Sequence, residues 1–198
     1  MILGPGLPFL QEARAFCYIL FTMEYLFTLT DKDIFPRPEF PKPDAYKKRM
    51  AVKAVVTSDE GKYAFVTNPV HGFILLPGGG AETEDLFKEI ERECAEEIAL
   101  EITVLKKIGI AHEIRNRDGK EYETVCFLAK AGKKLESDAR TEDEKKNDLH
   151  VVWLDEKEAL KILGEQQEKV NRGGVEFYNT AFNIVRDLRF FTEYLRFR

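Results

Sequence analysis

The chain has 198 residues, of which 44% are apolar and 33% are charged, and its formal net charge is −5. This composition is typical of one globular domain with a substantial core, and the negative charge argues against a general affinity for nucleic acid phosphates. The three cysteines, Cys17, Cys94 and Cys126, are widely spaced and odd in number, which indicates a reducing, cytoplasmic location and no disulfide framework.

An N-terminal extension, residues 1–43, precedes the single predicted domain, residues 44–198. Residues 15–29 are nearly all apolar or aromatic, but the run is too short and too interrupted to span a bilayer, and no basic segment precedes it. We expect this run to pack on the domain or against a second subunit, with Met23 as an alternative natural start. Residues 35–43 carry four prolines and predict an extended connector.

Three short apolar runs predict strands in front of a glycine-rich segment. A turn and a short loop separate them, and the strands are expected at residues 49–57, 62–67 and 73–76. His71, just before the third strand, is a candidate for the mouth of a pocket. The third strand delivers the chain into Pro77 and three glycines.

The stretch after the glycines, up to Leu100, predicts an amphipathic helix crowded with carboxylates. Its apolar stripe comprises Leu86, Ile90, Cys94 and Ile98, and we expect Cys94 to serve packing. Beside that stripe lie Glu89, Glu93, Glu96 and Glu97. Such like charges destabilise a bare helix, so their retention favours a divalent cation, since Mg²⁺ and Mn²⁺ prefer carboxylate oxygens. The plainer alternative is a solvated acidic helix.

Gly78 to Leu100 resembles the Nudix box, G-x5-E-x7-R-E-U-x-E-E-x-G-U, where U is an apolar residue. The matching positions are Gly78, Glu84, Arg92, Glu93, Cys94, Glu96, Glu97 and Leu100. Ala99 stands in place of the last glycine, where a left-handed conformation would cost alanine roughly 1 kcal/mol. We therefore expect the helix to end one residue differently or to run slightly longer.

The elements after the box complete the arrangement. Strands are predicted at residues 101–114 and 121–129 around an Asp-Gly hairpin signal, then at 149–154 after an exposed polar loop, residues 132–148. Asp155 is expected to cap a short helix that Gly164 ends, followed by a polar loop at 165–174. The helical spacing at 175–197 predicts a long C-terminal helix, which lies on the core or forms the interface of a homodimer.

The resemblance implies an α/β fold, a Nudix-type α/β/α sandwich with a mixed central sheet. It also implies a hydrolase that cleaves a diphosphate linkage in a nucleoside diphosphate derivative or a nucleoside triphosphate. Glu93, Glu96 and Glu97 would bind Mg²⁺ or Mn²⁺, together with a backbone carbonyl of Gly78 or its neighbour. Arg92 would hold Glu93 or a nearby carboxylate in place, and Glu84 would have a structural role near the helix start.

The general base is open on the sequence alone. It would be Glu93 or a carboxylate of the polar loop, where Glu142, Asp143 and Glu144 are candidates and Glu144 is our choice.

Residues that select the substrate are harder to identify. Tyr63, Phe73, Phe177 and Tyr178 would stack on a base, and His112 and Arg115 would reach the substrate from the hairpin, although core roles explain most of these residues equally well. We see two alternative functions: a non-catalytic nucleotide-sensing module, and an RNA cap hydrolase, which the negative charge disfavours.

Overall fold

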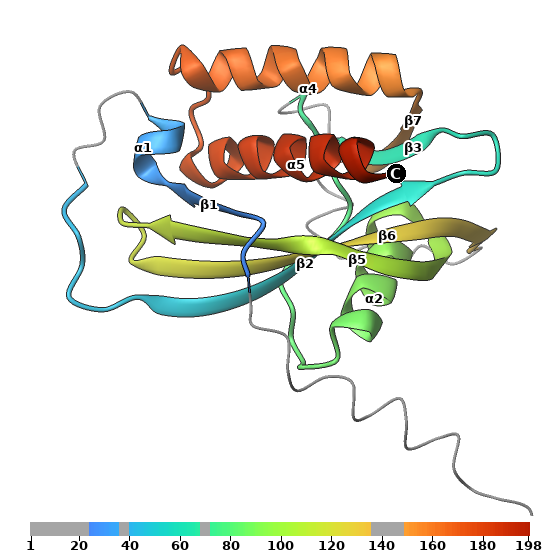
Figure 1. Cartoon of the computed structure of the whole chain (residues 1–198), viewed down its shortest axis with the longest axis horizontal. Coiled ribbons are helices and arrows are strands. Elements are labelled where there is room, and N and C mark those ends of the chain that lie inside the picture. Colours follow the sequence, from blue (N-terminus) through green and yellow to red (C-terminus); the bar gives the residue numbers. More distant parts are fainter. Residues whose placement is uncertain (1–23, 36–39, 68–71, 136–148) are drawn as a thin grey trace, which may run out of the picture.

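A mixed sheet forms the middle layer of the molecule in the computed structural model, which describes residues 24–35, 40–67, 72–135 and 149–198. The sheet has seven strands, with α2 (Leu86–Ile98) on one face and α4 (Glu156–Asn171) and α5 (Tyr178–Phe197) on the other (Figure 1). This arrangement confirms the predicted α/β sandwich with a mixed central sheet.

The strands are β1 (Phe27–Thr30), β2 (Lys47–Thr57), β3 (Tyr63–Thr67), β4 (Ile74–Leu75), β5 (Leu100–Arg115), β6 (Lys120–Lys134) and β7 (His150–Leu154). Six of the seven strands follow the predicted order along the chain, whereas β1 was not predicted. Their order in the sheet is β1-β5-β6-β2-β3-β4, and β7 also pairs with β3. The β1–β5 and β2–β6 pairs are parallel, whereas the other pairs are antiparallel. The hairpin between β5 and β6 turns at Asp118 and Gly119, as predicted.

The two faces of the sheet bury separate cores. In β2, Val52, Ala54 and Val56 pack towards α2, while Val55 belongs to the core beneath α4 and α5. A strand that is buried on both faces has no polar side to alternate with, which explains why Val55 blurs the sequence pattern. Burial of each of these valine side chains contributes about 1.5–3 kcal/mol to the free energy of unfolding, and the smaller alanine contributes less.

The helix after Asp155 is longer than predicted. Asp155 caps it as expected, with its side chain accepting from the N–H of Glu158 at 2.8 Å, but α4 continues through Gly164 to Asn171. The predictions of an end at Gly164 and of a polar loop at 165–174 are therefore wrong for most of that range. Buried side chains recur at helical spacing along the whole helix, at Ala159, Leu163, Gln166 and Val170. This packing outweighs the weak helix propensity of one glycine.

Part of the N-terminal segment belongs to the sheet. β1 lies at its edge against β5, and it is followed by α1 (Asp31–Ile34), which packs against α5. Leu29 and Ile34 are buried in a core shared with α5. The described part of the segment thus packs on the domain. The division at residue 43 stays a prediction, and Cys17, Met23 and most of the proline connector lie outside the described residues.

None of the helices that the structure describes is long and apolar enough to cross a membrane.

Candidate functional site

The glycine turn, which we define as residues 77–80, is fastened to β2 by its backbone. The N–H groups of Val52 and Ala54 donate to the carbonyls of Gly79 (2.9 Å) and Pro77 (3.0 Å). Gly78 has a φ of +125°, and a Cβ there would lie 2.2 Å from the carbonyl oxygen of Val52. Glycine is therefore required at this position by both conformation and space.

Helix α2 begins at Leu86, after residues 81–85, and buries most of its predicted stripe. Asp85 caps it by accepting from the N–H of Lys88 at 3.3 Å, and Glu84 is exposed just before the cap. Cys94 is fully buried, which confirms its packing role, and burial raises the pKa of its thiol. The helix ends at Ile98, with Ala99 in the left-handed conformation (φ 52°, ψ 41°). The expectation of a shifted end is wrong, because Ala99 adopts the conformation that glycine would have taken.

Arg92 gathers three carboxylates of α2. Its Nη2 donates to Glu89 at 2.9 Å and to Glu93 at 2.6 Å, and its Nη1 donates to Glu96 at 2.8 Å. Arg92 thus contacts Glu93, and its role in catalysis stays a prediction. The like charges on this face of the helix are offset by one guanidinium.

Glu89 and Glu93 have opposite pKa shifts although both are largely buried. Hydrogen bonds from Arg92 and from the Thr83 hydroxyl (2.8 Å) lower the pKa of Glu89 to about 2. Burial raises the pKa of Glu93 above its ordinary value, against the opposing effect of Arg92. Glu89 is therefore a fixed anion that anchors Arg92, whereas Glu93 has the greater tendency to accept a proton.

Glu93 and Glu97 flank the glycine turn. Glu97 accepts a hydrogen bond from the N–H of Gly78 at 2.6 Å, and a Cβ at Gly79 would lie 2.5 Å from an oxygen of Glu93. Two of the three predicted carboxylates, Glu93 and Glu97, therefore lie against the turn, and their role as metal ligands stays a prediction. Their oxygens have the chemistry that Mg²⁺ or Mn²⁺ prefers.

The carboxylates as placed do not yet form a coordination sphere. Glu93 and Glu96 bind Arg92, and Glu97 binds the turn. Across the described ranges, no group of three or more histidine, cysteine, aspartate or glutamate side chains is arranged to hold a metal ion. The donor set therefore fits a divalent cation chemically, and binding requires these side chains to rotate towards a common point.

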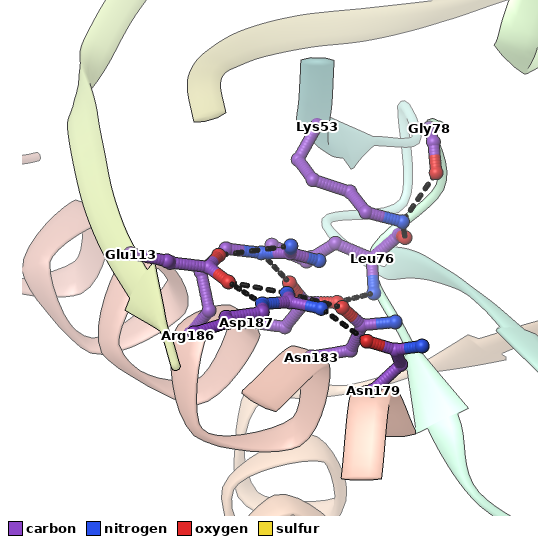
Figure 2. Close-up of polar contacts among 9 residues, drawn as sticks. Lys53, Leu76, Gly78, Glu113, Asn179, Asn183, Arg186 and Asp187 are labelled. Carbon is purple, nitrogen blue, oxygen red and sulfur yellow. Dashed lines mark hydrogen bonds and ion pairs between the residues drawn. The ribbon is translucent and has the colours of Figure 1, made fainter. Parts of the chain in front are cut away.

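Lys53 is a part of the site that the sequence interpretation missed. It lies on β2, is 6% exposed, and its Nζ donates to the carbonyl oxygens of Leu76 (2.8 Å) and Gly78 (Figure 2). The Gly78 carbonyl, predicted as a metal ligand, thus accepts a hydrogen bond from an ammonium group. A charged residue between apolar residues of a predicted strand is the sequence signal that could have identified Lys53.

A buried ionic network supports the strand that enters the turn. The N–H of Leu76 donates to Asp187 at 3.0 Å, and Arg186 joins Asp187 (2.9 Å) to Glu113 (3.1 Å). Figure 2 shows this network beside Lys53 and Gly78. Helix α5 and strand β5 therefore hold the entry to the glycine turn from the face opposite α2.

Two of the candidate substrate residues have core contacts. Tyr63 packs on Phe191 with a ring distance of 5.0 Å, and Tyr178 stacks on Phe35 at 5.4 Å. Phe177 is half-exposed and Phe73 is partly buried against the core beneath α5. The structure does not bring Tyr63 and Tyr178 together as a nucleobase platform.

The hairpin candidates are also engaged. His112 stacks on the Tyr25 ring at 4.6 Å and contacts Glu121 at 2.7 Å. Arg115 is 2% exposed and lies over the rings of Tyr122 and Phe182. His71, Glu142, Asp143 and Glu144 fall outside the described residues, so their roles stay predictions.

A family model and several solved structures match the chain. The model of the NUDIX domain matches residues 47–173. The chain is similar to a NUDIX hydrolase from Nitrosomonas europaea, with 20% identity, 71% of this chain and 89% of that chain covered, and a TM-score of 0.48. It is also similar to the E. coli ORF135 protein, with 21% identity, coverage of 59% and 80%, and a TM-score of 0.45. An ADP-ribose pyrophosphatase from Streptococcus suis has 18% identity, coverage of 45% and 65%, and a TM-score of 0.36. No curated protein matches the sequence.

Proposed function

The chain belongs to the Nudix family, and from this premise we propose that it is a pyrophosphohydrolase dependent on Mg²⁺ or Mn²⁺. Its substrate is a small molecule, either a nucleoside diphosphate derivative such as a sugar nucleotide or a nucleoside triphosphate. The observation that supports this proposal is the placement of Glu93 and Glu97 against the glycine turn, with Glu96 joined to Glu93 through Arg92.

The proposed reaction is attack of water on one phosphorus atom of the diphosphate. A bond forms between phosphorus and the water oxygen, the bond to the bridging oxygen breaks, and a nucleotide and a second phosphate-bearing product leave. A bound divalent cation would supply positive charge and acidify the attacking water. Glu93, Glu96 and Glu97 are the residues that would hold it, with the Gly78 carbonyl as the fourth predicted ligand.

The residues of the chain have distinct roles in this proposal. Glu93 is the proposed acceptor of the proton of the water, and Glu144 is the alternative base. Arg92 orients Glu93 and Glu96 through its guanidinium. Glu97 holds the backbone of the turn through the Gly78 N–H.

A nucleotide-sensing module without activity is the second candidate. Such a module would be expected to lose carboxylates of the box, whereas this chain keeps Glu93, Glu96 and Glu97. A cytoplasmic location remains part of the proposal, supported by the buried free thiols of Cys94 and Cys126. Homodimer formation through α5 stays a prediction.

The test is the substitution Glu97→Gln, assayed with Mg²⁺ against a panel of sugar nucleotides and nucleoside triphosphates. We expect kcat to fall about a hundredfold or more, because a proposed metal ligand loses its charge. Glu91→Gln is the matched control, since Glu91 is exposed on the same helix. Unchanged activity in Glu97→Gln, or a wild-type protein that cleaves nothing in the panel, would overturn the enzyme proposal.

A further inference from the structure

Lys53 places an ammonium group among apolar residues in the middle of β2. Its neighbours Val52 and Ala54 are fully buried, and Lys53 itself is 6% exposed. Taking a charge out of water costs free energy unless the group is paired or hydrogen-bonded. The environment of this side chain must therefore compensate for a cost that an apolar residue would avoid.

The compensation comes from the glycine turn. Both hydrogen bonds of Lys53 Nζ go to neutral backbone oxygens, those of Leu76 and Gly78 (Figure 2). The neighbouring buried cation, Arg186, is instead bound to the carboxylates of Asp187 and Glu113. Lys53 consequently brings a positive charge to the turn that its own hydrogen-bond partners do not neutralise.

The turn has little freedom to release this contact. The N–H of Gly78 is bound to Glu97, and the N–H of Leu76 is bound to Asp187. The backbone of Gly78 also lies directly against the carbonyl of Val52. The Gly78 carbonyl is therefore fixed on Lys53, and a metal ion on the same oxygen would meet a like charge at short range.

We propose that Lys53 is a positioning residue that occupies the Gly78 carbonyl in place of a metal ion. Glu93, Glu96 and Glu97 then bind the divalent cation without that oxygen. The ammonium group fixes the turn and adds a positive charge beside the site that would receive the diphosphate. This inference rests on the proposed function, and it revises one member of the expected ligand set.

Mn²⁺ binding in the absence of substrate tests the proposal. We expect Lys53→Met to bind Mn²⁺ about tenfold more tightly than the wild type in an electron paramagnetic resonance titration, which corresponds to about 1.4 kcal/mol. The gain arises because the Gly78 carbonyl becomes available and a like charge is removed. Lys88→Met is the matched control, since Lys88 is exposed on α2 and pairs with Asp85 at the start of that helix. The Mn²⁺ affinity of this variant should stay unchanged.

Equal or weaker Mn²⁺ binding by a folded Lys53→Met protein would overturn the proposal. Lys53→Gln replaces it if that variant does not fold, because the amide keeps one neutral donor for the turn. Tighter Mn²⁺ binding is expected for this variant too, through removal of the like charge alone. A crystal structure of the wild type with Mn²⁺ gives an independent answer. The ion should lie on the glutamates with Lys53 still on Gly78, and direct coordination of Mn²⁺ by the Gly78 carbonyl refutes the idea.

The two proposals fail in different ways. A wild-type protein that binds no Mn²⁺ and hydrolyses nothing contradicts the metal-dependent function. Gain of Mn²⁺ binding on Lys53→Met would support the role of Lys53 even then, and the lack of any gain would refute it.

Discussion

At the level of single residues, Ala99 ends α2 in the left-handed region at φ 52°. It is the only non-glycine residue with a positive φ among those the structure describes. Its N–H donates to the carbonyl of Cys94, and its own carbonyl accepts from Leu135 at 2.8 Å. The surrounding hydrogen bonds thus hold alanine in a conformation that is costly for it.

Ala99→Gly should raise the free energy of unfolding by about 0.5–1 kcal/mol, because glycine adopts this conformation without steric cost and the gain exceeds its greater loss of entropy. Urea denaturation measures the change. Ala95→Gly, within the same helix, is the control and should lower stability by about 1 kcal/mol. A stability that does not rise in Ala99→Gly would mean that the position is unstrained.

The lowered pKa of Glu89 predicts that the free energy of unfolding decreases in acid. The pKa of Glu89 is lowered from 4.5 to about 2 by Arg92 and Thr83, so its contribution to stability is complete above about pH 4.5. This contribution should be lost as the pH falls from about 4.5 to about 2. Urea denaturation in the presence of EDTA measures it, and Glu89→Gln should flatten the slope in this window. An identical slope in the variant and the wild type would show that the Arg92 contacts add nothing.

At the level of elements, α4 shows which glycine ends a helix. Gly164 lies inside the helix, and a Cβ there would meet no atom within 4 Å, whereas Gly173 has a φ of +71° directly after the helix. The N–H of Gly173 donates to the carbonyl of Val170 at 2.9 Å, which closes the last turn. Gly173 is therefore the stop signal that the sequence analysis assigned to Gly164.

Gly164→Ala should stabilise the protein by about 0.5–1 kcal/mol, since alanine has the better helix propensity and the space is open. Gly173→Ala is its counterpart and should destabilise the protein, because a positive φ is unfavourable for alanine. Thermal or urea denaturation of both variants distinguishes them. Two changes of the same sign would contradict the assignment.

Features that depend on neighbouring residues in the chain could be predicted from the sequence, whereas features that depend on contacts between distant segments could not. The strands from β2 to β7, the hairpin at Asp118 and the box helix depend on local periodicity and turn chemistry, and they were predicted. β1 was not predicted as a strand, and β6 extends to Lys134, into the range that was expected to be a polar loop. The length of α4 depends on burial of Gln166 and Val170 against other elements, and the polar side chain of Gln166 interrupts the apolar pattern that would have indicated this length. The carboxylates of the site were found through a motif, whereas Lys53 and the roles of Asp187 and Glu113 depend on pairings across the fold.

At the level of the whole molecule, the buried ions tie α5 to the sheet beneath it. Asp187 and Glu113 are fully buried and share Arg186, while Asp187 also binds the N–H of Leu76. Breaking a buried pair leaves an uncompensated charge, which is far more costly than losing an exposed pair.

Asp187→Ala should therefore lower the free energy of unfolding by about 3–5 kcal/mol. Glu168→Ala is the control, because it breaks an exposed pair with Arg172 and should cost about 0.5 kcal/mol or less. Denaturant titration measures both. Comparable small losses in the two variants would show that the network contributes little to the fold.

The parallel pairings of the sheet have a consequence for how the chain acquires its structure. Phe27 pairs with Ala111, and Lys47 pairs with Lys120. Neither pairing can form until a segment more distant along the chain has been synthesised. Large sequence separation between contacting residues slows folding, because chain entropy is lost before the contacts form. The glycine turn is hydrogen-bonded to β2, and β2 pairs with β6, which follows it by many residues in the chain. We therefore expect the candidate site to be assembled only at the end of folding, together with the sheet and in one cooperative step.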